Sequence, residues 1–99
     1  MKVPKRVKVG AMTYDVNKVK RPVTLGSKVC YGTISYDELI IELDDRYPEQ
    51  KLHRTFLHEL LHAIAVDRGI ELGEQEEEIV DAFAIGLYAL IVDNPQIFK

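Results

Sequence analysis

The amino-acid sequence predicts an α+β fold, in which a small, mostly antiparallel sheet of two hairpins precedes two helices. Three observations lead to this prediction. Apolar and polar residues alternate over much of the first half of the chain, which is typical of strands. Helical periodicity replaces this alternation after Pro48, and the helical part is divided by Gly69 and Gly73. At 99 residues, the chain 1–99 is expected to form a single domain.

The first predicted hairpin pairs Arg6–Val9 with Met12–Val19 through a Gly-Ala turn. Val and Tyr alternate there with polar residues, as they do in a strand with one buried face. The next stretch, Arg21–Ser27, contains Pro22 and Gly26 and is predicted to be a connecting loop.

The second predicted hairpin pairs Val29–Ser35 with Leu39–Leu43 around a polar turn of sequence Tyr-Asp-Glu. The chain then enters the first helix, for which Asp45 is a suitable cap and Pro48 suits an early helical position. Cys30 lies in a strand-like run and is expected to be a small buried hydrophobic residue.

The first helix carries the sequence His58-Glu59-Leu60-Leu61-His62, the HExxH signature of zinc hydrolases. Residues four apart lie on one face of a helix, so the imidazoles of His58 and His62 can converge on one ion at roughly 2.0–2.1 Å per nitrogen. Glu59 is rotated from His58 by about 100°. It is therefore expected beside the metal without ligating it, where it can accept a proton from water.

The rest of this helix is suited to burial. A broad apolar arc faces away from the two histidines and comprises Leu52, Phe56, Leu57, Leu60, Ala63 and Ile64. The third histidine, His53, lies nearly opposite His58 on the helical wheel and cannot reach the same ion. We expect His53 to be a partly buried structural residue near the start of the helix, with a substrate contact as the alternative if the helix begins later.

A catalytic zinc ion usually has three protein ligands and one open position. Because the chain offers no further suitable histidine, a carboxylate is the expected third ligand, and Glu74–Glu78 opens a second helical run from Ile79 to about Val92. Glu78 shares a stripe with the small residues Ala82, Gly86 and Ala89, which would allow close approach to another helix. We therefore predict Glu78 as the third ligand, with Glu77 and Glu74 as alternatives.

Asp81 follows Glu78 by one turn of the helix. From there its carboxylate can accept the outer N–H of His58 or His62, which would fix the orientation of the ring. A solvent-facing aspartate is the alternative interpretation. Tyr36, Tyr88 and His53 are candidates for a donor to a developing oxyanion, although each also has a structural explanation.

Composition excludes several classes of protein. No apolar run is long enough to cross a membrane, the N-terminus lacks the apolar core of a signal peptide, and the single cysteine fits a reducing compartment, so a cytoplasmic protein is expected. Residues 1–28 carry eight Lys and Arg against one Asp, whereas residues 29–99 carry five against fifteen acids. No cluster of aromatic residues accompanies the basic segment, so nucleic acid is not expected as a partner.

From Gly32 to the C-terminus, the chain resembles a group of small zincin-like metallopeptidases of phages and other mobile elements, which are distant relatives of the ImmA/IrrE family. The matching segments are Gly32–Tyr36, Leu39–Leu43, Thr55–Ile64, Glu77–Asp81 and Gly86–Pro95. The metal histidines of the family fall on His58 and His62, its catalytic glutamate on Glu59, and its distal ligand near Glu78.

The resemblance implies zinc-dependent hydrolysis of peptide bonds, with a protein or peptide as substrate, for instance a regulatory protein of a mobile element. It also implies that a strand at the edge of the sheet, for which Leu39–Leu43 is the candidate, pairs with an extended substrate. Two alternatives belong to other classes. One is a non-catalytic binding protein that keeps zinc for stability. The other is an interaction module with a vestigial site, which uses its basic N-terminal segment to hold a partner.

Overall fold

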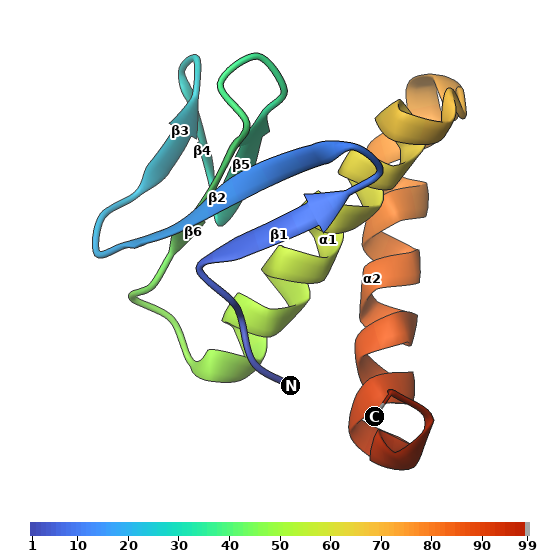
Figure 1. Ribbon diagram of the computed structural model, residues 1–99. Helices are drawn as coiled ribbons and strands as arrows, with labels where there is room; N and C mark the ends of the chain where they lie inside the picture. The colour runs from blue at the N-terminus through green and yellow to red at the C-terminus, as the bar shows by residue number, and fades with distance from the viewer. Residues whose placement is uncertain (99) are drawn as a thin grey trace.

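A four-stranded sheet, a helix packed against it and a second helix beyond the first make up the fold of the protein (Figure 1). The structure is a computed structural model that describes residues 1–98. In Figure 1, helix α1 runs between the sheet and helix α2, so the elements form three layers. The predicted α+β class, with a mostly antiparallel sheet and two helices, is confirmed.

The sheet is built from the two predicted hairpins. Strands β1 (Arg6–Val9) and β2 (Met12–Val19) form the first hairpin, and strands β5 (Gly32–Ser35) and β6 (Ile40–Asp44) form the second. The strand order is β1-β2-β6-β5, with antiparallel pairing inside each hairpin and parallel pairing between β2 and β6. Strand β6 is therefore an interior strand, and β5 lies at the edge.

The region between the hairpins differs from its prediction. The expected loop Arg21–Ser27 contains strand β3 (Val23–Leu25), which pairs with β4 (Lys28–Cys30) in a separate two-stranded sheet. The expected strand Val29–Ser35 is consequently broken at Tyr31. The prediction was wrong because the strand breakers lie at the ends of β3. Pro22 precedes it, and Gly26 turns the chain with a positive φ of 64°.

Helix α1 (Glu49–Arg68) begins after Pro48 and is capped at its C-terminus by Gly69. Gly69 adopts the left-handed conformation, and the N–H groups of Gly69 and Ile70 donate to carbonyl oxygens in the last turn of the helix. The predicted capping role of Asp45 is wrong, since residues 1–98 provide no side-chain cap at the start of α1. The backbone N–H of Asp45 instead donates to the Val19 carbonyl oxygen at 2.7 Å, which extends the β2–β6 pairing.

The core lies between the sheet and α1. Ile41 and Leu43 point to the same side of β6 and are fully buried there, because alternate residues of a strand share one face. They pack with Leu52, Phe56 and Ala63 of α1. Burial of each large apolar side chain in such a core contributes about 1.5–3 kcal/mol. This packing fixes α1, and with it the histidine motif, relative to the sheet.

Helix α2 (Glu76–Asp93) follows a 3-10 turn at Gly73–Gln75 and is followed by another at Pro95–Phe98. Its buried residues are Val80 and Ala84, which face α1. Of the acidic residues predicted to open the second helix, Glu76, Glu77 and Glu78 form its first turn, and Glu74 lies in the preceding 3-10 turn. Among the helices of residues 1–98, none has the length and apolar character needed to cross a membrane.

Candidate metal centre

The two histidines of the HExxH motif lie on the side of α1 that faces the first turn of α2. The Nε2 atoms of His58 and His62 are 3.2 Å apart. Two nitrogen ligands of one tetrahedral zinc ion, each about 2.0–2.1 Å from it, would be separated by about 3.3 Å. The imidazole rings therefore have the spacing that a shared ion requires, as the i, i+4 pattern predicts.

A carboxylate from α2 completes the group. The side chain of Glu77 reaches both rings, with one oxygen 3.2 Å from His58 Nε2 and the other 2.7 Å from His62 Nε2. One ligand atom from each of His58, His62 and Glu77 lies within 4.8 Å of the others, so the three residues can hold a metal ion. This donor set, two imidazoles and one carboxylate, fits a divalent ion such as zinc.

The structure brings Glu77, the alternative in the sequence analysis, to the histidines in place of Glu78. The ligand group found within residues 1–98 includes neither Glu78 nor Glu74. The reason is the orientation of α2. Glu77 lies on the same side of the helix as Val80 and Ala84, which pack against α1, whereas the stripe of small residues that includes Glu78 faces outward. Close helix packing was therefore inferred for the wrong face.

Carboxylates also contact the outer nitrogens of both rings. Asp81 Oδ1 lies 3.4 Å from His58 Nδ1, so Asp81 occupies the position that the sequence analysis assigned to it. Glu76 Oε2 lies 2.8 Å from His62 Nδ1. The contact of Glu76 with His62 was not predicted from the sequence, because it depends on where α2 begins and on how the helix is rotated.

These contacts determine which nitrogens are left for a metal. A carboxylate at Nδ1 favours the tautomer that carries its proton on that nitrogen and donates it. In this tautomer, both Nε2 atoms would present lone pairs to each other and to the carboxylate of Glu77, an arrangement that a bound cation would stabilise. The site thus has the electronic character of a metal site as well as its spacing.

Glu59 lies next to this group and is 6% exposed. Burial raises the pKa of its carboxyl group to about 7. The nearby His62 opposes this effect, and the negative charge of Glu77 adds to it. A carboxyl group with such a pKa can both accept and release a proton near neutral pH. The position beside the ligands is the one predicted for Glu59 from the helical spacing.

The three candidate oxyanion donors separate in space. His53 Nδ1 lies 3.2 Å from the hydroxyl oxygen of Tyr88, and its Nε2 lies 3.5 Å from Glu49, so His53 is a buried residue with partners on both sides. Tyr36 instead lines the groove that contains the metal ligands. Burial and the nearby carboxylate of Glu59 raise the pKa of Tyr36 to about 12, which keeps its hydroxyl group protonated.

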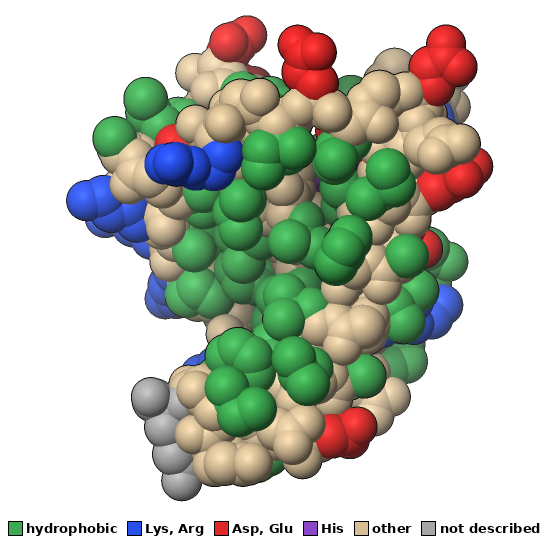
Figure 2. All heavy atoms as spheres, turned by 90° about the vertical axis from the view of Figure 1, so that its right-hand side faces the viewer, with side chains coloured by type: hydrophobic (Ala, Val, Ile, Leu, Met, Phe, Trp, Pro, Cys, Tyr) green, Lys and Arg blue, Asp and Glu red, His purple; other side chains and the backbone are tan. Residues whose placement is uncertain are grey.

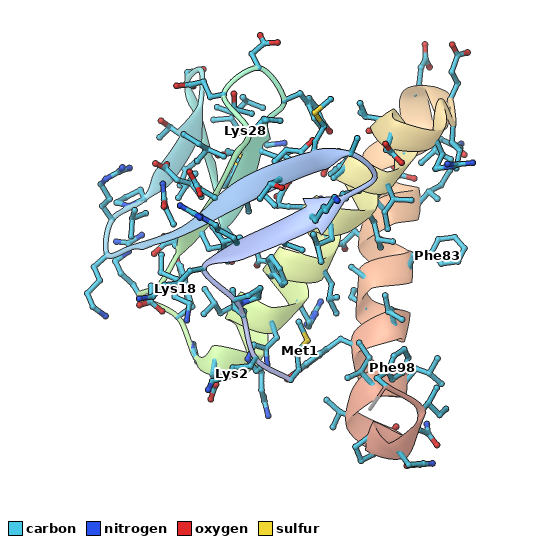
Figure 3. The ribbon with its side chains drawn as sticks, in the orientation of Figure 1. Met1, Lys2, Lys18, Lys28, Phe83 and Phe98 are labelled. Carbon is cyan, nitrogen blue, oxygen red and sulfur yellow. The ribbon has the colours of Figure 1, made fainter. Side chains whose placement is uncertain are left out.

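A groove of about 840 Å³ surrounds the site. The β3–β4 hairpin lines it with the apolar side chains of Leu25 and Val29. Tyr31, which follows the hairpin, and strand β5 also line the groove. Lys28, labelled in Figure 3, is the first residue of β4 and also lines the groove. Cys30 is half-buried and lines the groove, so it is more accessible than expected. The edge strand beside the metal site is β5, and the assignment of Leu39–Leu43 to the edge was wrong.

Comparison of the chain with protein-family models, with curated proteins and with solved structures gave no match. The resemblance to zincin-like metallopeptidases therefore stays a prediction from the sequence motifs.

Proposed function

We propose that the protein is a zinc-dependent metallopeptidase with a minimal zincin-like fold. In this proposal His58, His62 and Glu77 bind the metal, and Glu59 is the catalytic base. The observation that supports it is that the side chains of His58, His62 and Glu77 converge beside the buried carboxyl group of Glu59. Two imidazoles and one carboxylate leave an open position on zinc, which distinguishes a catalytic site from a closed structural site with four Cys or His ligands.

The residues around the metal have distinct chemical roles. When bound, zinc supplies Lewis acidity, which lowers the pKa of water and polarises a carbonyl group. Glu59 accepts a proton from the attacking water and delivers it to the leaving amine. Glu76 and Asp81 hold the two imidazole rings in the orientation and tautomer that metal binding needs.

The groove supports a peptide as the substrate. Strand β5 pairs with β6 on one side, so a peptide in an extended conformation could add to its other side through backbone hydrogen bonds. The apolar side chains of Leu25 and Val29 would then contact substrate side chains. The hydroxyl group of Tyr36 faces the same groove and would donate a hydrogen bond to the carbonyl oxygen under attack.

The experiment that tests this proposal measures zinc and cleavage in the same samples. The purified protein is loaded with zinc, incubated with a peptide library made from a digested proteome, and new termini are identified by mass spectrometry. The wild-type protein should bind one zinc per chain and cleave peptides. The Glu59→Gln variant should bind the same amount of zinc and lose at least about a hundredfold in rate, because general base catalysis typically contributes 10²–10⁴-fold.

The control variant is Glu71→Gln, which removes an exposed glutamate between the two helices and should cleave like the wild type. Cleavage by Glu59→Gln at the wild-type rate would eliminate Glu59 as the base. Zinc binding without any cleavage that depends on Glu59 would instead support the alternative, a non-catalytic binding protein that keeps the metal for stability.

A further inference from the structure

Helix α2 exposes more apolar surface than its packing against α1 would require. Residues 82–92 contain no charged side chain, and Tyr88 is the most polar among them. A helix that is apolar on all sides is normally covered on all sides. Among the described residues of α2, however, only Val80 and Ala84 are buried, because α2 packs against α1 along one side.

The side of α2 that points away from α1, which we call the outer face, has a regular shape. Small residues run along its centre, and large apolar residues flank them. The outer face comprises Ala82, Gly86 and Ala89 at the centre, Phe83 and Leu90 on one flank, and Ile85 and Val92 on the other. Figure 2, which looks onto this side of the molecule, shows hydrophobic side chains gathered along it. Figure 3 shows Phe83 pointing away from α1 and the sheet.

No other element of residues 1–98 packs closely on Gly86. A glycine inside a helix is destabilising relative to alanine, so it is expected where another backbone comes close. Apart from its two chain neighbours and the nearby backbone of α2 itself, no heavy atom of residues 1–98 lies within 4 Å of a Cβ built on Gly86. The position of Gly86 is therefore open to the close approach of a helix from another molecule.

We propose that the outer face of α2 binds the outer face of a second copy of this chain, with the two helices antiparallel and related by a two-fold axis near Gly86. A two-fold interface needs a surface that is complementary to itself. On the outer face, Phe83 and Leu90 lie three residues before and four residues after Gly86. In an antiparallel pair, each large side chain would then lie over the small central residues of the other copy.

The area of the outer face is adequate for such a dimer. Phe83 is 69% exposed and Leu90 is 47% exposed, and the apolar residues Ile97 and Phe98 extend the surface beyond the end of α2. Six large apolar residues contribute, and each is about half exposed. At about 150–250 Å² per large side chain, they expose roughly 600 Å² per copy. A standard interface buries about 800 Å² per partner, so this surface is at the lower end of the size range of specific interfaces.

Charge favours a second copy over a membrane surface. Acidic residues flank the outer face at both ends, with Glu78 before it and Asp93 after it. Anionic lipid headgroups would repel these carboxylates, and residues 76–93 contain no Lys or Arg that would attract them. In the dimer the carboxylates would lie at the rim, where water and salt screen their repulsion. Added salt should therefore tighten the dimer.

The test is sedimentation velocity of the full chain over a range of micromolar concentrations. The wild-type protein should show a concentration-dependent dimer, and Phe83→Glu should raise the dissociation constant at least about tenfold, since it places a charge in the centre of the interface. The matched control is Met12→Glu. Met12 is 50% exposed on the sheet, and its replacement should leave the dimer unchanged.

A second variant separates dimerisation from folding. Gly86→Leu should keep the wild-type circular dichroism spectrum, because a side chain there meets open space in the monomer, yet it should weaken the dimer at least about tenfold by blocking close approach. A wild-type protein that stays monomeric at every concentration would overturn the proposal. A dimer that Phe83→Glu and Gly86→Leu leave intact would overturn it equally, as would a monomer that binds vesicles of anionic lipid.

Discussion

The two helices contrast in how the protein uses them. Helix α1 is covered on one side by the sheet and on another by α2, and its buried residues form most of the core with β6. Helix α2 has the more apolar sequence but buries little of it in the described part of the chain. Apolar composition alone therefore does not identify the element that stabilises this fold. The stabilising helix is α1, which lies between the sheet and α2.

The contrast extends to the candidate site. Helix α1 provides the two imidazoles and Glu59 from a region fixed by the core, whereas α2 provides Glu76, Glu77 and Asp81 from its first two turns. The remainder of α2 contributes no residue to the ligand group within residues 1–98. We therefore expect substitutions to act on stability in the sheet and α1, on metal affinity at the start of α2, and on association along the outer face.

The largest effect is expected for the pair Leu43→Ala and Leu90→Ala. Leu43 is fully buried between the sheet and α1, so its truncation should lower the free energy of unfolding by about 2–5 kcal/mol through lost burial and the cavity left behind. Leu90 is half-exposed, and its truncation should change this free energy by less than about 0.5 kcal/mol. Urea unfolding of monomeric protein measures both values. Equal effects would show that α2 is as important to the core as β6.

The next largest effect is on zinc affinity, for which the glutamates at the start of α2 should differ. Glu76→Gln should weaken zinc binding about 10–100-fold, because the carboxylate that orients a ligating imidazole is lost. Glu77→Gln should weaken it further by removing a ligand oxygen, and Glu78→Gln should leave it nearly unchanged. Competition with a chromophoric chelator measures all three affinities. A larger loss for Glu78→Gln than for Glu77→Gln would restore Glu78 as the ligand.

The residues of α1 in the site could be predicted from the sequence because their geometry is local. The spacing of His58 and His62 within one helix fixes their relative positions, and the same helix fixes Glu59 beside them. The third ligand comes from another element, so its identity depends on the rotation of α2 about its own axis. Small residues suggested one rotation, whereas the packing of Val80 and Ala84 against α1 selects another.

In the sheet, too, local sequence patterns predict the elements but not how they are arranged. Alternation and turn residues predicted both hairpins, but the order of the strands follows from the parallel pairing of β2 with β6, which no local pattern specifies. The interior position of β6 and the edge position of β5 follow from that pairing. The short strand β3 was missed because three residues are too few to show periodicity.

Replacing a glycine by alanine is expected to have a smaller effect on the free energy of unfolding, with opposite signs in β5 and in α2. A Cβ on Gly32 of β5 would lie 2.6 Å from Thr55 Cγ2 and 3.1 Å from the backbone oxygen of Glu42. The Thr55 hydroxyl donates to the Lys51 carbonyl oxygen, which holds its side chain in place. Gly32→Ala should therefore lower the free energy of unfolding by about 1–3 kcal/mol.

Gly86→Ala is the matched substitution on the outer face of α2. A Cβ there meets open space, so the free energy of unfolding of the monomer should rise by about 0.5–1 kcal/mol through the higher helix propensity of alanine. Thermal or urea unfolding at a concentration that keeps the protein monomeric measures both variants. Stabilisation by Gly32→Ala would contradict the close packing of β5 on α1.

The smallest effect is expected at the junction between β6 and α1, where Asp44 is buried. Its carboxylate accepts hydrogen bonds from the backbone N–H of Arg46 at 3.1 Å and from the guanidinium group at 2.9 and 2.7 Å. These bonds hold the pKa of Asp44 below its usual value, although burial opposes them. A carboxyl group with a lowered pKa stabilises the folded state above its unfolded pKa of about 3.9, and this stabilisation is lost as the pH falls through the lower folded value.

Asp44→Asn should therefore unfold at a lower urea concentration than the wild type at pH 7, while the amide oxygen still accepts one hydrogen bond from Arg46. The difference should shrink as the pH falls below 4, because the wild-type carboxylate becomes protonated there. Asp15→Asn is the control, since Asp15 forms an exposed ion pair with Arg6 that contributes little at any pH. A gap between Asp44→Asn and the wild type that does not change with pH would show that the charge of Asp44 does not stabilise this junction, which would then depend on the sheet and α1 packing alone.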